Sequence, residues 1–315
     1  MNIIEIENVS KTFAEHVAVH QLSLTVPAGS IYGFIGPNGS GKTTTLRMIM
    51  RIYYPDPGSG SIRVLGESAT GAANDRVGYL PEERGLYKKM KVRDILRFYA
   101  ELKGRKDFRS AVADWLDRLD LGAWANKKVE TLSKGMAQKV QFISAVITEP
   151  ELVILDEPFS GLDPVNADVL REEVLALRKR GSTVIFSTHD MSVAEQMCDY
   201  IFMIYKGNKV LDGTLDSIQD RYGQDTVRVC VEGNGYDPNS IAGVLRVNDF
   251  GRFQELHMSP GADTQHILSQ LIKCGHVNHF ELIKPSLHDI FVRIARPVVE
   301  DSSGLRSVSK EVARA

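Results

Sequence analysis

One stretch of the chain has the residue types and spacing that suit phosphate binding, Gly36-Pro37-Asn38-Gly39-Ser40-Gly41-Lys42-Thr43-Thr44. It fits the phosphate-binding loop pattern G-x-x-x-x-G-K-[ST]. Glycines let the backbone curl so that successive N–H groups point inward at phosphate oxygens. Lys42 would reach the β- and γ-phosphates, and the Thr43 hydroxyl would ligate Mg²⁺. The pattern also occurs in glycine-rich turns of no function, so the neighbouring segments must decide between the two interpretations.

The segments on either side favour the phosphate site. Residues 30–35 form a short apolar run that predicts a buried strand. Residues 43–51 predict a helix, because Leu46, Ile49 and Met50 recur at helical spacing. A loop that enters a helix at its N-terminus adds the positive end of the helix dipole to an anion site.

Acidic residues follow a second predicted strand. Residues 152–155 are four apolar residues, and Asp156 and Glu157 come directly after them. Because ligands bind at the carboxyl edge of an open α/β sheet, we expect Asp156 in the Mg²⁺ shell and Glu157 beside an attacking water. The alternative is that both acids pair with lysines. Residues 183–188 predict another buried strand that ends at His189, for which we favour a γ-phosphate contact over a structural role.

Two further segments allow a binding role or a structural one. Short strands predicted at 2–9, 17–19 and 22–26 make the region before the loop β-rich, and Phe13 lies in a turn between the first of them. Its ring would stack on adenine or pack in a small satellite core. Ser133 and Gly135 open a helix predicted from about residue 137 to 147, where they form a second phosphate cradle or a plain N-cap.

The composition excludes several classes of protein. The chain has 315 residues, 43% of them hydrophobic and 25% charged, with a formal net charge of −2, which argues against a broad nucleic-acid surface. No apolar run of about 18 residues and no signal peptide are visible. Cys198, Cys230 and Cys274 are an odd number of widely spaced cysteines, which favours reduced thiols in a cytosolic protein.

Taken together and in this order, the segments resemble the ATP-binding cassette (ABC) transporter ATPase family over roughly residues 2–220. The resemblance implies ATP and Mg²⁺ as cofactors, with residues 36–44 and 152–157 binding Mg-ATP. Residues 132–136 match the family's signature motif, usually L-S-G-G-Q, which faces the γ-phosphate held by a partner subunit. Residues 160–163, ending in Asp163, match the loop that crosses the dimer interface. His189 matches the switch histidine, and Phe13 matches the adenine-stacking aromatic.

The chain departs from the family pattern at two places. The signature segment has Lys134 and Met136 where Gly and Gln are usual, although Ser133 and Gly135 remain. Glu82 stands where the family has a glutamine that links Mg²⁺ to the transport-coupling helices. Both departures resemble a bacterial export-type branch, and we expect Glu82 to keep a contact with Mg²⁺.

The implied fold class is α/β: a P-loop NTPase core of ABC ATPase type with a β-rich N-terminal subdomain and an inserted helical subdomain. We expect the cassette at residues 1–222, with the helical subdomain at about 84–150. A small α+β accessory domain would follow at 223–296, and a flexible tail at 297–315. Cys274, His276 and His279 have the spacing C-x-H-x-x-H, which matches no established metal site, so no metal is expected there.

The resemblance implies that the chain is the cytosolic ATP-hydrolysing subunit of a transporter, at the inner face of the cell membrane. The resemblance to the export-type branch implies that this transporter is an exporter. Its partners would be integral-membrane permease subunits and a second ATP-binding subunit, identical or related, without nucleic acid. One alternative is a soluble ABC ATPase acting on ribosomes or DNA, but such proteins carry two cassettes or a long coiled coil. A small-molecule kinase would not need the signature segment.

Overall fold

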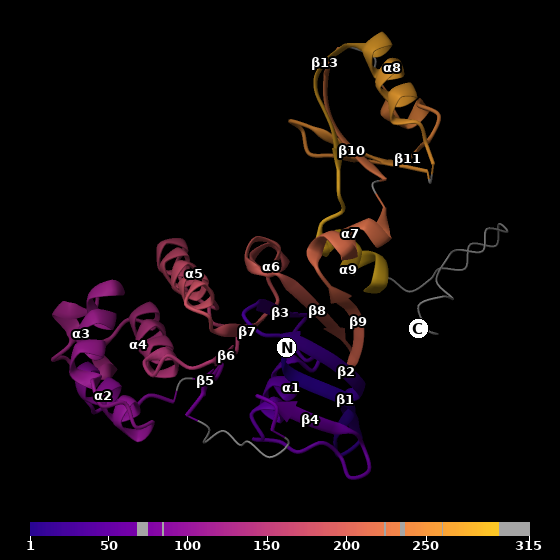
Figure 1. The fold of residues 1–315 in the computed structure, drawn as a ribbon. Helices are drawn as coiled ribbons and strands as arrows, with labels where there is room; N and C mark the ends of the chain where they lie inside the picture. Colours follow the sequence, from indigo (N-terminus) through magenta and orange to yellow (C-terminus); the bar gives the residue numbers. More distant parts are fainter. Residues whose placement is uncertain (68–74, 84, 224, 234–236, 260, 296–315) are drawn as a thin grey trace.

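The computed structural model describes residues 1–67, 75–83, 85–223, 225–233, 237–259 and 261–295. Within these residues the chain forms three β-sheets with helices packed around them (Figure 1). The tail predicted at 297–315 lies outside the described residues. None of the helices in the described ranges combines the length and apolar character that crossing a membrane requires.

A six-stranded sheet in the order β5-β6-β7-β3-β8-β9 forms the centre of the cassette. Its strands are β3 (Ile31–Ile35), β5 (Val77–Leu80), β6 (Leu152–Leu155), β7 (Thr183–Thr188), β8 (Tyr200–Tyr205) and β9 (Asn208–Gly213). All neighbours are parallel except β8 and β9. Every residue of β3, β6 and β7 is buried, which explains their apolar runs. The parallel strands therefore deliver the residues that follow them to one edge.

Helices flank this sheet, and all but the first of them begin at a side-chain cap. They are α1 (Lys42–Ile49), α5 (Pro164–Lys179), α6 (Met191–Met197) and α7 (Leu215–Tyr222). Asp163 caps α5 and Asp190 caps α6, each accepting backbone N–H groups of the first turn. Although burial raises the pKa of Asp190, hydrogen bonds from Ser192 and from the N–H of Val193 hold it below its ordinary value.

A second, antiparallel sheet has the order β2-β1-β4. Its strands β1 (Asn2–Phe13) and β2 (His16–Pro27) precede the phosphate loop in the sequence, and β4 (Ser61–Val64) follows it. The prediction of two separate strands at 17–19 and 22–26 was wrong, because both segments belong to the single strand β2. A register shift between Val9 and Lys11, which pair with Leu22 and Val19, and a positive φ of 44° at Gln21 absorb the irregularity. The strand continues through a bulge where the sequence indicates a break.

The predicted helical subdomain is confirmed as α2 (Val92–Leu102), α3 (Phe108–Arg118) and α4 (Lys134–Val146), with 3₁₀ turns at Gly122–Trp124 and Val129–Thr131. Figure 1 shows these helices grouped to one side of the central sheet. Trp115 on α3 packs its edge against Phe142 on α4, with ring centroids 6.0 Å apart. The helix α4 begins earlier than predicted, because the Ser133 hydroxyl accepts the N–H of Met136 and caps it.

The small α+β module after the cassette is also confirmed. Its antiparallel sheet has the order β11-β12-β10-β13, and Figure 1 shows it projecting away from the cassette. The elements are β10 (Thr226–Glu232), a 3₁₀ turn (Pro238–Ser240), β11 (Val244–Asp249), β12 (Gln254–Met258), α8 (Thr264–Cys274) and β13 (His276–Ile283). Its own core includes Val227, Leu256 and Leu271. The boundaries drawn at 222 and 296 remain a prediction.

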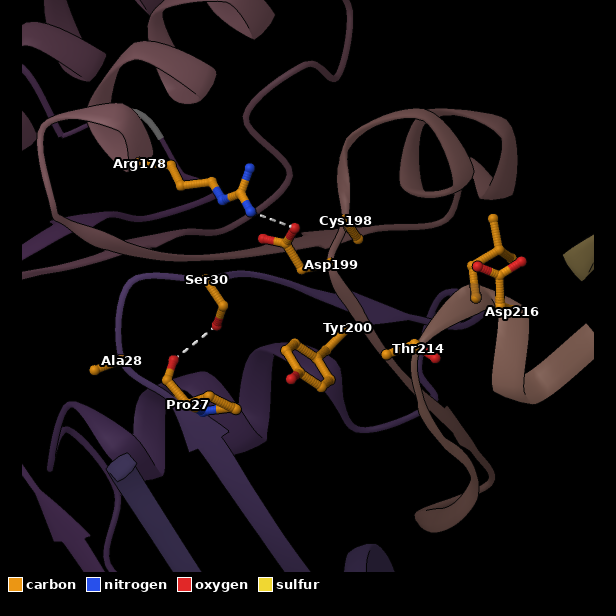
Figure 2. Close-up of a pocket in the computed structure, with 10 residues that line it drawn as sticks. Pro27, Ala28, Ser30, Arg178, Cys198, Asp199, Tyr200, Thr214 and Asp216 are labelled. Atoms are coloured by element: carbon orange, nitrogen blue, oxygen red, sulfur yellow. Dashed lines mark hydrogen bonds and ion pairs between the residues drawn. The ribbon is translucent and has the colours of Figure 1, made fainter. Parts of the chain in front are cut away.

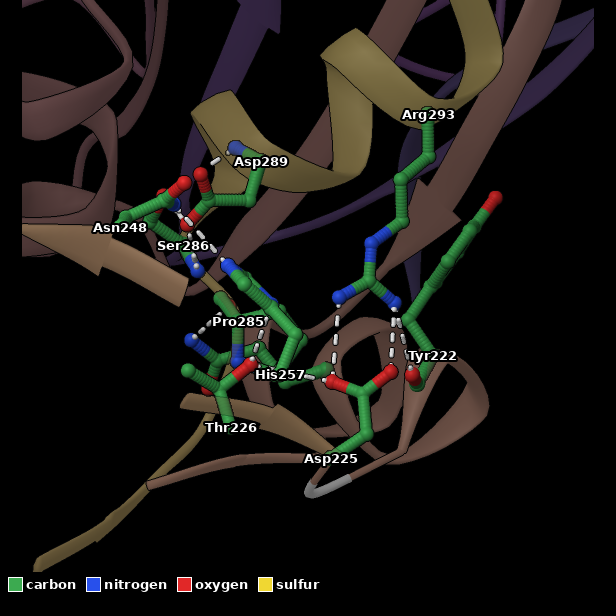
Figure 3. Close-up of polar contacts among 10 residues, drawn as sticks. Tyr222, Asp225, Thr226, Asn248, His257, Pro285, Ser286, Asp289 and Arg293 are labelled. Atoms are coloured by element: carbon green, nitrogen blue, oxygen red, sulfur yellow. Dashed lines mark hydrogen bonds and ion pairs between the residues drawn. The ribbon is translucent and has the colours of Figure 1, made fainter. Parts of the chain in front are cut away.

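The last described helix, α9 (Leu287–Ala295), returns to the cassette. Its Leu287 and Ile290 are fully buried in one cluster with Ile201 and Ile218. The N–H of Leu287 donates to Glu195 Oε1 on α6 at 2.5 Å. Figure 3 shows the Arg293 guanidinium of α9 held by the Asp225 carboxylate, at 3.0 and 3.1 Å. By packing, α9 is part of the cassette even though it follows the accessory sheet in the sequence.

Candidate nucleotide site

The phosphate loop connects β3 to α1 and requires glycine at specific places. Gly36, Gly39 and Gly41 have φ values of 153°, 75° and 113°, in the region that favours glycine. An added Cβ at Gly36 would overlap the carbonyl oxygen of Ile204, and one at Gly41 would overlap that of Ala18. At Gly39 an added Cβ would meet nothing within 4 Å. The loop is therefore packed on its inner side and open on the other.

Lys42 is a buried ammonium group held by the loop itself. Its Nζ donates to Gly36 O at 2.6 Å and Pro37 O at 3.1 Å, and lies 3.7 Å from Glu157 Oε1. Burial lowers the pKa of Lys42, and the charges of Glu157 and Asp156 oppose that shift. A cation with 5% exposure, whose hydrogen bonds go to two backbone carbonyls of its own loop, is electrostatically suited to an anionic ligand.

Asp156 follows β6 and is fully buried. Its Oδ1 accepts the Thr43 hydroxyl at 3.2 Å and the Ser187 hydroxyl at 2.5 Å. Its Oδ2 is buried without a hydrogen-bond partner. Because a buried charge without a partner is costly, the free oxygen indicates a site that a ligand or a metal completes.

Glu157 is held in a strained position beside Asp156. Its φ of 50° is unusual for a non-glycine residue, and such strain concentrates at functional sites. The N–H of Glu157 donates to Ser187 Oγ at 2.8 Å, and its Oε2 lies 3.1 Å from His189 Nδ1. Its Oε1 is buried and has no hydrogen-bond partner. The side chain is thus oriented through one oxygen while the other remains available.

A pocket of about 400 Å³ brings many of the predicted residues together. The predicted residues that line it are Phe13, Asn38, Gly39, Ser40, Gly41, Lys42, Thr43, Thr44, Glu82 and Glu157. His16 and Ala18 of β2 line it too, and the sequence analysis missed both. Only the pairing of β2 with β1 places them beside Phe13, so no local pattern could have found them.

Phe13 ends β1 and is 40% exposed. Tyr53 packs its edge against the Phe13 ring, with centroids 5.2 Å apart and an interplanar angle of 69°. The Lys11 ammonium lies 5.5 Å from the Phe13 centroid. The ring is therefore supported from behind by a second aromatic and faces the pocket, rather than filling a core.

Ser133, Gly135 and Asp163 do not line this pocket. Ser133 caps α4, and Asp163 caps α5 by accepting the N–H of Asn166 at 3.0 Å. An added Cβ at Gly135 would lie 3.5 Å from the side chains of Asn166 and Leu162. Within one chain these residues form an interface between the start of α4 and the loop before α5.

A larger pocket of about 580 Å³ lies elsewhere, beside Ser30, Arg178, Asp199 and Tyr200 (Figure 2). Arg178 and Asp199 pair at 2.7 Å, so neither charge is free for a ligand. Burial raises the pKa of the Cys198 thiol in its wall, so this sulfur is a poor nucleophile. None of the motif residues lines this pocket, and the candidate site is the smaller one.

The chemistry of the donor set fits Mg²⁺. This ion binds through one or two carboxylates, keeps several waters and takes the rest of its ligands from phosphate. Thr43 Oγ1 and the free Oδ2 of Asp156 offer such oxygens, and Glu82 lines the same pocket. Among the described residues, those around Cys274, His276 and His279 included, no three His, Cys, Asp or Glu side chains come together as metal ligands, so the Mg²⁺ assignment rests on the hydroxyl of Thr43 and on phosphate oxygens beside the carboxylates.

Comparisons with known proteins identify two families of domain in this chain. The ABC transporter family profile matches residues 19–160, and a profile described as ATP-binding protein DrrA1-3-like, C-terminal domain, matches residues 213–295. The uncharacterized ABC transporter ATP-binding protein YhaQ of Bacillus subtilis (strain 168) is 42% identical over 301 residues, covering 95% of this chain and 100% of the relative.

Two further similarities are more distant. The Nod factor export ATP-binding protein I of Sinorhizobium fredii (strain NBRC 101917 / NGR234) is 31% identical, covering 95% of this chain and 87% of the relative. A solved structure of the ATP-binding subunit of an ABC transporter has a TM-score of 0.65 and 29% identity, covering 70% of this chain and 93% of that one. With its phosphate loop, its paired carboxylates and its near full-length relatives, the chain belongs to the family of ABC transporter ATP-binding proteins.

Proposed function

We propose that this ATPase powers an export-type transporter as a dimer bound to integral-membrane permease subunits at the inner face of the cell membrane. The observation that carries the proposal is the 400 Å³ pocket that Lys42, Thr43, Glu82 and Glu157 line. Asp156 is not in the lining, but it accepts the hydroxyl of Thr43, and its Oδ2 is buried without a hydrogen-bond partner. The export direction is supported by the Nod factor export relative. ABC transporter ATP-binding subunits work with membrane permeases, which supports the choice of partner.

Nucleotide binding would use both ends of the pocket. The Phe13 ring, supported by Tyr53, offers an apolar face for the adenine at the β1 end. The backbone N–H groups of residues 38–43 and the N-terminus of α1 would receive the phosphates. Lys42 would exchange its carbonyl contacts for phosphate oxygens and stabilise the charge that develops on the γ-phosphoryl group.

Thr43, Asp156 and Glu82 would hold Mg²⁺, which would supply positive charge against the negative charge that develops on the phosphoryl group. Two contacts prepare the chain for this role. Asp156 Oδ1 is fixed by the hydroxyls of Thr43 and Ser187, so the carboxylate cannot rotate freely. Fixing one oxygen leaves the other, Oδ2, directed into a buried polar site.

Glu157 would accept the proton of the attacking water. A general base must lie within hydrogen-bond reach of the proton that it removes, and Glu157 Oε1 has no hydrogen-bond partner, although the Lys42 ammonium lies 3.7 Å from it. His189 holds the other oxygen at 3.1 Å and so orients the carboxylate. The His189 side chain is 55% exposed, which leaves its second ring nitrogen available to the γ-phosphate.

The proposed dimer follows from where the signature residues lie. Ser133 and Gly135 are absent from the lining of the chain's own pocket, and the family arrangement would bring them to the pocket of a second subunit. Asp163 lies in the loop packed beside them. We propose an interface with two ATP sites, formed by identical or related subunits.

Substitution of Lys42 by alanine tests the assignment of the site. Purified Lys42→Ala should lose ATP hydrolysis, because the one buried cation of the phosphate loop is removed. Lys179→Ala, at the exposed end of α5, is the matched control and should keep the wild-type rate. If Lys42→Ala stays within about twofold of wild type, this loop is not the catalytic nucleotide site. Copurification with a multi-span membrane protein, rather than with ribosomes, tests the transport assignment.

A further inference from the structure

The loop that carries Glu82 is tied to the helix that carries the signature segment. Gln141, in the second turn of α4, donates its Nε2 to Pro81 O and to Glu83 O, each at 3.3 Å. These carbonyls belong to the residues on either side of Glu82. One side chain therefore holds the peptide group before Glu82 and the peptide group after Glu83, and so fixes the short segment that carries Glu82.

The amide of Gln141 is costly to keep in this place. The residue is 4% exposed, and its Oε1 is buried without a hydrogen-bond partner. An apolar side chain of similar size would fill the same volume without leaving an unpaired acceptor. The contacts that the amide gains are the two carbonyls around Glu82, so the polar group serves this loop rather than the packing of α4.

A second glutamine on α4 makes a parallel contact. Gln138 lies one turn before Gln141 on the same face of the helix. Its Nε2 donates to Pro158 O at 3.1 Å, directly after Glu157. The helix thus holds the loops that follow β5 and β6, which carry Glu82 and Glu157.

The helix also belongs to the rigid core of the helical subdomain. Val140, Phe142 and Ile143 are fully buried in the cluster that contains Trp115. Because closely packed elements move as units, a displacement of the helical subdomain would carry α4 and the carbonyls bound to Gln141 with it. Ser133 caps the same helix about two turns before Gln141, roughly 12 Å along the axis at about 1.5 Å of rise per residue.

We propose that Gln141 is a positioning residue that sets the Glu82 carboxylate and couples it to the position of the signature helix. The inference rests on the proposed role of Glu82 toward Mg²⁺. Through α4, the engagement of Ser133 with a second subunit's nucleotide would adjust the chain's own Mg²⁺ site. Neither Gln138 nor Gln141 acts on the reacting atoms. Each acts on the reaction through the carboxylate whose loop it holds, Glu157 for Gln138 and Glu82 for Gln141.

The test uses the full-length chain with Gln141→Met, which keeps the length and volume of the side chain and removes the amide. The Mg²⁺ concentration that gives half-maximal ATPase activity should rise by roughly five- to twentyfold, since a buried hydrogen bond contributes about a factor of ten. Binding of a fluorescent ATP analogue without Mg²⁺ should change less than about twofold. Ser144→Ala on the same helix, which removes only a hydroxyl bound to the Gln141 backbone, is the control and should match wild type.

A double-mutant cycle with Glu82→Ala separates positioning from general damage to the fold. If Gln141 acts through Glu82, the double variant should need no more Mg²⁺ than Glu82→Ala alone. The proposal would be overturned if the two substitutions raised the Mg²⁺ requirement by factors that multiply in the double variant. It would also be overturned if Gln141→Met left the Mg²⁺ requirement unchanged. Gln141→Glu, whose carboxylate repels both carbonyls, enters the same cycle if circular dichroism shows that the methionine variant is unfolded. Failure of the wild-type chain to bind ATP would instead refute the proposed function.

Discussion

The docking of α9 predicts how the cassette responds to two different deletions. One chain ends at Tyr222 and lacks both the accessory sheet and α9. The other lacks only residues 226–283 and joins Asp225 to Lys284 through a short glycine-serine linker. Thr226 and Ile283 are direct partners in the antiparallel pair of β10 and β13, so their Cα atoms lie about 5 Å apart and a linker of about four residues closes the gap.

The magnitude follows from the burial of α9. Leu287 and Ile290 are fully buried against Ile201, Met203 and Ile218. Full burial of one such side chain contributes roughly 1.5–3 kcal/mol, so the pair contributes about 3–6 kcal/mol. Since whole domains are stable by roughly 5–15 kcal/mol, the chain that ends at Tyr222 should lose a large fraction of its stability and expose an apolar surface.

The assay is urea unfolding of both chains, followed by circular dichroism, together with ATP binding by the folded protein. We expect the linker chain to unfold close to the full-length cassette and to bind ATP, because no residue of the nucleotide pocket is removed. The chain that ends at Tyr222 should unfold at lower urea and aggregate. Equal unfolding midpoints would refute the argument from α9. A folded linker chain without ATP binding would show that the accessory module contributes to the site.

Three further outcomes are expected at the nucleotide site. Glu157→Gln should bind ATP but hydrolyse it roughly a hundredfold more slowly or worse, so that an ATP-bound dimer accumulates on size exclusion; free hydrolysis would exclude Glu157 as the base. Glu82→Gln should reduce transport only mildly, whereas Glu82→Ala should reduce transport more than it reduces ATP binding. If Glu82→Gln reduces transport as much as Glu82→Ala does, the acid itself is needed. Tyr53→Leu should raise the KM for ATP by roughly two- to tenfold with kcat unchanged, because an edge-to-face aromatic pair contributes about 0.5–1.5 kcal/mol; a lower kcat at constant KM would contradict the supporting role toward Phe13.

The sequence by itself determined the parts of this protein whose cause is local. The glycines at 36, 39 and 41 are required by their own backbone angles, and the apolar runs at 31–35 and 152–155 are required by burial between neighbouring strands. Because parallel strands share a carboxyl edge, the order of strand and acid was enough to place Asp156 and Glu157 near the phosphate loop. The fold class and the family followed from these short-range patterns.

Only the tertiary structure decided the contacts between distant segments. Thr43 meets Asp156 across 113 residues of sequence. Tyr53, in the turn after α1, supports Phe13 at the end of β1 through a contact that no sequence spacing indicates. In the sequence, nothing distinguishes Gln141 from other helix residues. Its role becomes visible only in the folded chain, where the loop around Glu82 lies against it. The helix α9 reads as the end of an accessory domain, yet Leu287 and Ile290 complete the core of the cassette. A periodic pattern indicates that one face of a helix is apolar. Which surface buries that face depends on the packing of the whole chain.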